Sequence, residues 1–260
     1  MQRGWQLVWI GVLLLAPALI LALAPPLPQS QVYHDFADQR ILLGIPNLLN
    51  ILSNLPFLLT GLAGLGLCLS RPPSTAPLSW LCFFIAFSLV ALGSSYYHRA
   101  PADATLVWDR LPMTLAFMSV FSAILNDTVF PGCERHLLPP LLALGLSSVI
   151  WWRCSGDLRF YAWVQFAPLL CIAFLMKFHG FRELERGGIY AAFLAYVLAK
   201  ICEALDSPIY DLTRQWVSGH SLKHLAAAAS GGFLYSMLRR HRQRSQYGHR
   251  LAQDSRVDEI

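Results

Sequence analysis

Residues 47–69, which read NLLNILSNLPFLLTGLAGLGLCL, decide the fold of this chain. The stretch carries no charged side chain, and as a helix it extends roughly 30 Å, the thickness of the hydrocarbon core of a bilayer. A helix satisfies its own backbone hydrogen bonds, which is the condition for crossing lipid. The stretch is therefore predicted to be a transmembrane helix, within which Pro56 is tolerated.

Apolar stretches of similar length recur along the 260-residue chain. They predict eight spans, at residues 7–24, 47–69, 77–97, 105–126, 137–152, 160–178, 188–205 and 219–238. The fifth is the weakest, because it is short and contains Pro139 and Pro140. The first also resembles a signal peptide, since Arg3 precedes it and Ala22-Leu23-Ala24 resembles a cleavage site. Its length favours a retained span; without it the count is seven.

The composition supports an all-α, multi-pass membrane bundle. Apolar residues make up 55% of the chain and charged residues only 13%, against about a quarter in soluble domains. We expect a seven-span domain at residues 31–238, preceded by an extra N-terminal span and link (1–30) and followed by a basic, disordered tail (239–260). The six cysteines are scattered, which indicates small core residues and neither a disulfide framework nor a thiolate metal site.

The net charge of +5 does not indicate nucleic-acid binding once it is located. Much of it lies directly after the last span, which is typical of a cytoplasmic end: Arg239, Arg240, Arg242, Arg244 and Arg250. With that tail inside, the inner links carry Arg3, Arg71, Arg135, Lys177, Arg182 and Arg186, and the outer links carry Arg40, Arg99, Arg153, Arg159 and Arg214. This bias predicts a cytoplasmic C-terminus.

Two histidines, His220 and His224, open the last span four residues apart. On a helix this spacing puts both imidazoles on one face, about 6 Å apart along the axis, where one metal ion can take both. Such pairs also arise by chance, so the spacing alone favours a structural role.

The topology brings further polar residues to the same side of the membrane. Ser94 and His98 lie one turn apart at the outer end of the third span, and Asp109 lies at the outer start of the fourth. Three neutral imidazoles with an open fourth position are typical of a catalytic zinc site. Asp109 can then be a ligand, a partner of a histidine or a proton shuttle, and Ser94 can donate to an oxyanion. The alternative is a polar cluster that only holds helices together.

A second group of charges lies near the outer end of the seventh span. Lys200 and Glu203 can pair at i, i+3, and Lys223 on the neighbouring span can meet Asp206. Ion pairs that pack helices are the favoured interpretation of this group.

These residues together resemble the alkaline ceramidase family, within the superfamily of seven-span membrane hydrolases that also holds the progestin/adipoQ receptors. The resemblance rests on Ser94-x-x-x-His98, Asp109, His220-x-x-x-His224, Asp35-Phe36-Ala37-Asp38 and Asn50-Ile51-Leu52-Ser53-Asn54. It implies a zinc-dependent amidase that cleaves the N-acyl bond of ceramide. It assigns the metal to His98, His220 and His224, proton transfer to Asp109 and water or oxyanion binding to Ser94. The lipid would enter from the bilayer between helices.

The N-terminal acidic stretch departs from that family. Its eukaryotic members bind calcium there, whereas the corresponding positions of this chain are Asp35, Phe36, Asp38, Arg40 and Asn47. A guanidinium among the ligands opposes a divalent cation. Calcium is therefore doubtful, and we expect Arg40 to pair with Asp35 or Asp38 as a built-in cation.

Other functions remain open at this stage. One is a phospholipase-like hydrolase of acyl esters, a second is a receptor with a structural zinc, and a third is an ion transporter, suggested by membrane charges such as Asp109 and Lys200. We expect no obligate protein partner. The expected location is a bacterial inner membrane with the active site facing the periplasm.

Overall fold

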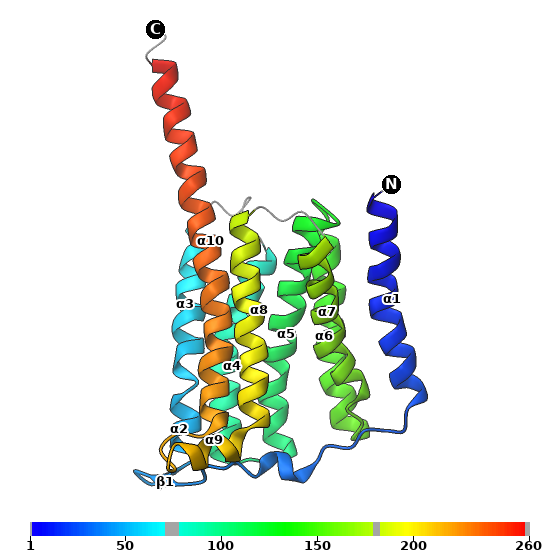
Figure 1. Ribbon diagram of the computed structural model, residues 1–260, viewed down its shortest axis with the longest axis vertical. Helices are drawn as coiled ribbons and strands as arrows, with labels where there is room; N and C mark the ends of the chain where they lie inside the picture. Colours follow the sequence, from blue (N-terminus) through cyan, green and yellow to red (C-terminus); the bar gives the residue numbers. More distant parts are fainter. Residues whose placement is uncertain (1, 71–77, 179–182, 258–260) are drawn as a thin grey trace.

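The computed structural model describes residues 2–70, 78–178 and 183–257, which are almost entirely helical. The long helices lie side by side in one bundle with α1 at its edge, and the described chain begins and ends at the same end of the bundle (Figure 1). The all-α prediction is confirmed. The elements are α1 (Gln2–Leu23), η1 (Gln31–His34), β1 (Ile41–Leu42), β2 (Ile45–Pro46), α2 (Leu48–Leu52), α3 (Leu55–Leu69), α4 (Leu78–Arg99), α5 (Asp103–Thr128), α6 (Glu134–Ser155), α7 (Arg159–Phe178), α8 (Glu183–Ala204), α9 (Asp206–Leu212) and α10 (Gly219–Val257).

Six helical stretches in the described ranges are long and apolar enough to cross a membrane. They are Gly4–Leu23, Leu48–Leu69, Leu78–Arg99, Glu134–Ser155, Arg159–Phe178 and Arg186–Ala204. The other two predicted spans correspond to α5 and α10, which are as long but carry charged residues such as Asp109 and Lys223. Arg71, Pro77 and Arg182, which entered the predictions, lie outside the described residues.

The predicted span at residues 47–69 is broken into α2 and α3 at Ser53 and Asn54. Proline at position 56 explains the break, because it lacks a backbone N–H and its ring opposes a continuous helix. The interruption frees backbone carbonyls at the end of α2, and the carbonyl of Asn50 is used by the site described below. The sequence pattern alone did not predict this break.

The tail at residues 239–260 was predicted to be disordered, but α10 continues through it to Val257. The helix projects well beyond the rest of the bundle (Figure 1). Arginine, glutamine, leucine and alanine favour helix, and this segment contains no proline. Because the preceding span already supplies the helical nucleus, each added residue extends α10 without a new nucleation cost.

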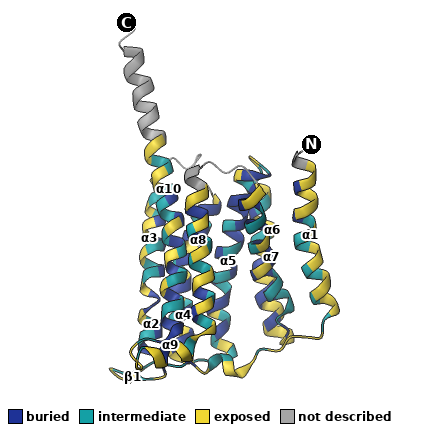
Figure 2. Cartoon of the chain, viewed as in Figure 1, coloured by how far each residue is buried: buried dark blue, intermediate teal, exposed yellow. Residues whose placement is uncertain are grey.

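Buried residues concentrate where α4, α5, α8 and α10 face one another, and α1 is largely exposed (Figure 2). Phe83, Phe84 and Phe87 of α4 form part of the main apolar core. A second, smaller cluster lies toward the opposite end of α4 and includes Tyr97 and Trp152. The site residues of α4, Ser94 and His98, lie on either side of Tyr97, at the end of the helix that carries the second cluster.

The turn between α6 and α7 holds the end of α1. Arg159 donates to the carbonyls of Leu21 (3.2 Å) and Ala24 (2.5 Å), which places a cation at the helix C-terminus. Asp157 accepts from Arg159 (Nε, 2.8 Å) and from the backbone N–H of Leu27 (3.1 Å). The hydrogen bond from Arg159 is the main reason that the pKa of Asp157 falls to about 2.

Candidate metal centre

Three histidines from two helices converge at one point. His98 lies in the last turn of α4, and His220 and His224 lie in the first turns of α10. Their candidate ligand nitrogens all lie within 4.8 Å of one another, and the three side chains are buried. The Nε2 atoms of His98 and His224 are 3.2 Å apart. The predicted topology placed these three residues on the same side of the membrane. Their contact in the structure agrees with that prediction.

Neighbouring groups orient the ring of His224. The hydroxyl of Ser53 donates to the carbonyl of Asn50 (2.8 Å), so its oxygen is free to accept from Nδ1 of His224, 2.7 Å away. Nδ1 also lies 3.2 Å from the carbonyl of Asn50. Both neighbours accept, so Nδ1 carries the proton and the lone pair of Nε2 points at the other histidines. The break between α2 and α3 creates this arrangement.

The histidine cluster fits a tetrahedral ion. Two zinc–nitrogen bonds of about 2.0–2.1 Å at a tetrahedral angle hold their nitrogens about 3.3 Å apart, which agrees with the 3.2 Å between His98 and His224. Among the described residues, the buried Nδ1 of His98 has no hydrogen-bond partner. Phe36 covers the cluster, with ring centroids 4.6 Å from His98 and 4.5 Å from His220. Three neutral imidazoles in an apolar surround are suited to Zn²⁺.

Asp109 and Ser94 adjoin the histidines. Asp109 is in the second turn of α5, Ser94 lies one turn before His98 on α4, and the two side chains are close enough to interact. Both are buried, and with His224 they line the same cavity. Ser94 and Asp109, which were predicted to act in catalysis, therefore lie on the wall of the cavity that His224 also lines.

The cavity is about 460 Å³ and extends from this polar end into the apolar core. Its deeper wall is formed by side chains of α4, α5, α7, α8 and α10, including Phe83, Phe87, Ile124, Ile172 and Leu234. Phe166 of α7 lines the cavity and is also 46% exposed on the outside of the bundle. Phe166 therefore belongs both to the cavity wall and to the exposed part of α7.

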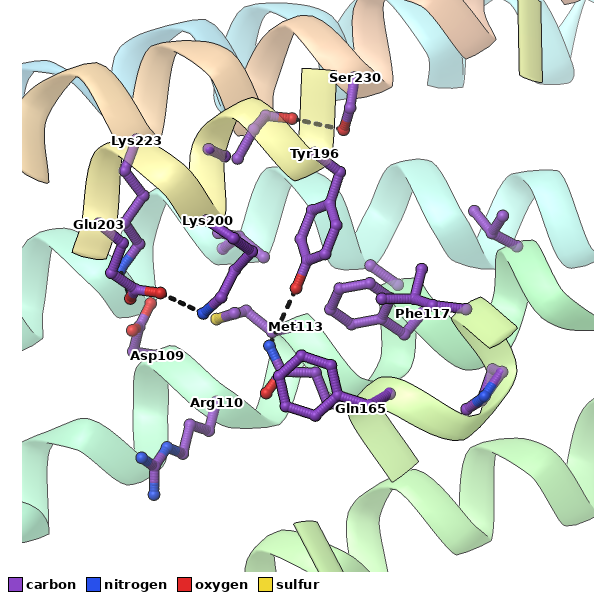
Figure 3. Close-up of a pocket in the computed structure, with 18 of the residues that line it drawn as sticks. Asp109, Arg110, Met113, Phe117, Gln165, Tyr196, Lys200, Glu203, Lys223 and Ser230 are labelled. Carbon is purple, nitrogen blue, oxygen red and sulfur yellow. Dashed lines mark hydrogen bonds and ion pairs between the residues drawn. The ribbon is translucent and has the colours of Figure 1, made fainter. Parts of the chain in front are cut away.

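Figure 3 shows charged side chains on the wall of this cavity. Lys223 pairs with Glu203 at 2.7 Å, and Lys200 pairs with the same carboxylate. Lys223 also lies 3.4 Å from Nε2 of His220. The prediction that Lys200 and Glu203 pair agrees with the structure, but Lys223 meets Glu203 and not Asp206. The position of this network against the candidate site was not predicted.

Asp206 has a different role from the predicted ion pair. Its carboxylate accepts from the backbone N–H of His220 at 2.7 Å and from that of Ala37 at 2.9 Å. It therefore caps the first turn of α10, where unpaired N–H groups and the helix dipole favour an anion. This bond ties the backbone of a histidine ligand to the segment before β1.

The four residues of the proposed cation-substituting group are not all together. Asp38 takes two hydrogen bonds from Arg40, each 2.8 Å long, whereas Asp35 pairs with Gln39. Burial of Asp38 acts to raise its pKa, but the hydrogen bonds and charge of Arg40 outweigh burial and the pKa is lowered. Asn47 donates to the backbone carbonyl of His98 at 2.9 Å.

Arg40 engages the Asp38 carboxylate of this group with its side chain. Its guanidinium also donates to the carbonyl of Trp216 at 3.2 Å and lies 5.5 Å from the centre of the Tyr210 ring. It thereby joins the segment before β1 to the loop that precedes α10. A site whose main carboxylate is already held by a guanidinium does not fit calcium.

The family can now be identified. The sequence profile of the Ceramidase family matches residues 41–187, more than half of the chain. This chain belongs to the ceramidase family. The match includes Ser94, His98 and Asp109, whereas His220 and His224 lie beyond it. Ceramidase membership and the apolar helices make the protein a multi-pass, ceramidase-like hydrolase of amide bonds. Among curated proteins no sequence matches it.

Proposed function

We propose that this ceramidase is a zinc-dependent amidase that hydrolyses the N-acyl bond of a ceramide-like lipid to a sphingoid base and a fatty acid. One observation carries the proposal: His224 of the buried three-histidine cluster lines one cavity with Asp109 and Ser94, and that cavity continues between largely apolar side chains into the core of the bundle. A hydrolase of a soluble amide has no need of such an apolar extension.

Residues of this chain supply the proton transfers. His98, His220 and His224 would hold zinc, which would supply Lewis acidity toward the amide carbonyl and lower the pKa of a bound water. Asp109 accepts a proton from the attacking water and returns it to the departing nitrogen as the carbon–nitrogen bond breaks. Ser94 lies beside the Asp109 carboxylate on the cavity wall, where its hydroxyl can donate to the oxyanion.

The cavity supports entry of the lipid from the bilayer. Its deep end runs beside α10 from His224 to Leu234, which is about 15 Å along the helix. Apolar side chains cover this length, so acyl chains can be held there while the polar end faces the histidines. The exposed edge at Phe166 supports a lateral entrance beside α7.

We also propose a bacterial inner-membrane protein with the site facing the periplasm and a cytoplasmic C-terminus. The histidines lie at the end of the bundle opposite to the projecting part of α10, which carries a basic stretch. The inside preference of arginine therefore supports an outward-facing site. Reporter fusions after residue 257 should be active in the cytoplasm; export of the reporter would reject this orientation.

The decisive experiment combines metal analysis with lipid hydrolysis. Purified wild-type protein should hold one zinc per chain and release fatty acid from ceramide, whereas His98→Ala should lose both. Asp109→Asn should keep zinc and lose turnover. Faster hydrolysis of a phospholipid ester than of ceramide would favour the ester hydrolase. Stoichiometric zinc without hydrolysis of either lipid would indicate a structural metal, and properly handled protein without zinc would overturn the proposal.

A further inference from the structure

Arg110 is a buried arginine on the cavity wall for which the described residues provide no carboxylate partner. Its side chain belongs to α5, and the residue is only 5% exposed. One nitrogen, Nη2, donates to the side-chain oxygen of Gln29 at 2.6 Å. The other, Nη1, is buried and has no hydrogen-bond partner among the described residues. A buried guanidinium in this state is costly unless an anion completes it.

Aromatic rings hold this guanidinium in place. Its central carbon lies 4.1 Å from the ring centre of Trp152, 4.6 Å from that of Tyr161 and 5.7 Å from that of Tyr33. Ring faces attract a cation but do not accept its in-plane N–H groups. The rings therefore fix the orientation of Arg110 and leave its free N–H groups available. Such fixation lowers the entropy lost when a ligand binds.

The neighbouring charges do not compensate Arg110. Glu203 is shared by Lys200 and Lys223, and Asp109 interacts with Lys223 more strongly than with Arg110. Those two acids and two lysines balance one another in formal charge. Asp109 precedes Arg110 directly, and adjacent residues do not face each other on a helix. Figure 3 shows the two side chains leaving α5 in different directions. Arg110 thus forms no ion pair among the described residues, and its nearest acids are engaged mainly by lysines.

The position of Arg110 relates that charge to the substrate. Gln29, Ser30 and Tyr33 line the cavity beside it, at the end away from the apolar extension near Leu234. A lipid whose chains fill the apolar end therefore presents its headgroup to this side. We infer that Arg110 binds an anionic group, phosphate or carboxylate, on the headgroup of the lipid amide. This assignment rests on the proposed function for the identity of the lipid, but the anion site itself does not.

Binding tests the site without turnover. Dodecyl phosphate and dodecanol, which share one chain, are titrated against the zinc-loaded protein, and Tm and tryptophan fluorescence are measured. Wild type should bind the phosphate tighter by about 10- to 100-fold, as expected for a charge-assisted hydrogen bond. Arg110→Gln should remove the difference, and Arg110→Lys should keep part of it. Arg153→Gln, which removes an exposed arginine of α6, is the control and should bind as wild type.

A preference retained by folded Arg110→Gln, or absent from wild type, would overturn the inference. If Arg110→Gln does not fold, the wild-type and Arg110→Lys titrations still decide it. Hydrolysis assays then distinguish the two possible sources of the anion, which are the headgroup of the lipid and the carboxylate of the fatty-acid product. Wild type should cleave ceramide 1-phosphate faster than ceramide, and fatty-acid inhibition should be the same in wild type and Arg110→Lys. If Arg110→Lys differs from wild type only in its inhibition by fatty acid, Arg110 binds the product, and the headgroup assignment is wrong. Binding of dodecyl phosphate without hydrolysis of either lipid would reject the proposed amidase function but would still support the anion site at Arg110.

Discussion

Gly93 allows α4 to contact the backbone of α5 at the residue pair that carries Asp109. A Cβ atom at position 93 would lie 1.9 Å from the carbonyl oxygen of Trp108 and 3.3 Å from the backbone nitrogen of Asp109. Real Cβ contacts are essentially never shorter than 3.0 Å. The Gly93→Ala substitution therefore forces the two backbones apart by roughly 1.1 Å, because close-packed interiors have no void to absorb the methyl group.

The displacement should separate proton transfer from metal binding. The histidines lie on α4 and α10, whereas Asp109 lies on α5. We expect Gly93→Ala to keep its zinc but to lose about 100-fold in kcat, the usual consequence of a misplacement of about 1 Å. Overpacking should also lower the free energy of unfolding by about 1–3 kcal/mol. Zinc per chain, kcat on ceramide and Tm measure the three effects.

Gly232→Ala is the matched control, because a Cβ atom at position 232 meets nothing within 4 Å. It lies on α10, the helix of two histidine ligands, and should retain full kcat and zinc. Its stability should rise slightly, since alanine favours a helix over glycine by about 1 kcal/mol. Wild-type kcat in folded Gly93→Ala, or loss of zinc with turnover per zinc unchanged, would refute the reasoning.

Three further perturbations test other parts of the structure. Ser53→Ala removes the nearer of the two acceptors of the His224 Nδ1 proton and should weaken zinc binding about 10- to 100-fold in competition with a chelator; unchanged affinity would contradict the assigned orientation. Asp157→Asn should lower Tm at pH 7. The lowered pKa of Asp157 stabilises the fold above about pH 4, and this contribution is lost as the pH falls toward 2. The curves of Tm against pH for wild type and Asp157→Asn should therefore converge near pH 2. A difference in Tm that stays constant with pH would argue against the ion pair with Arg159 as the cause. A calcium-selective chelator should leave activity unchanged because Arg40 holds Asp38, and activity restored by calcium after stripping would reject that role.

The sequence predicted the helices well and their interruptions poorly. Apolar stretches mark each long helix because lipid demands an apolar surface and internal hydrogen bonds. The break at Ser53 and Asn54 was missed because Pro56 is tolerated in many membrane helices. Whether a proline breaks a helix depends on which neighbours accept the freed groups. Here His224, from the far end of the chain, is one of those neighbours.

The sequence could identify candidate site residues only from the side and depth of the membrane at which the topology places them. His98, Asp109 and His220 were grouped because helix ends at one face of a membrane lie at similar depth. The partner of Lys223 was predicted wrongly, since Asp206 and Glu203 lie close together in sequence and only the packing of α8 on α10 distinguishes them. Nothing in the sequence marked Arg110 as a functional residue, because basic residues are common near the ends of membrane spans. Its significance comes from burial and from the partners that it lacks among the described residues.

The segments that close the histidine end of the bundle also hold the three-histidine cluster by its backbone groups. Asn47 donates to the carbonyl of His98, and Asp206 accepts from the N–H of His220. Arg40 joins this end of the chain to the loop before α10. Ligands held only by their helices would move whenever α4 and α10 shift relative to each other. Both backbones are tied to the same short connecting segments. Polar contacts outside the lipid core therefore fix the distance between the histidines. The membrane-spanning parts of the helices remain free to adapt to the occupant of the cavity.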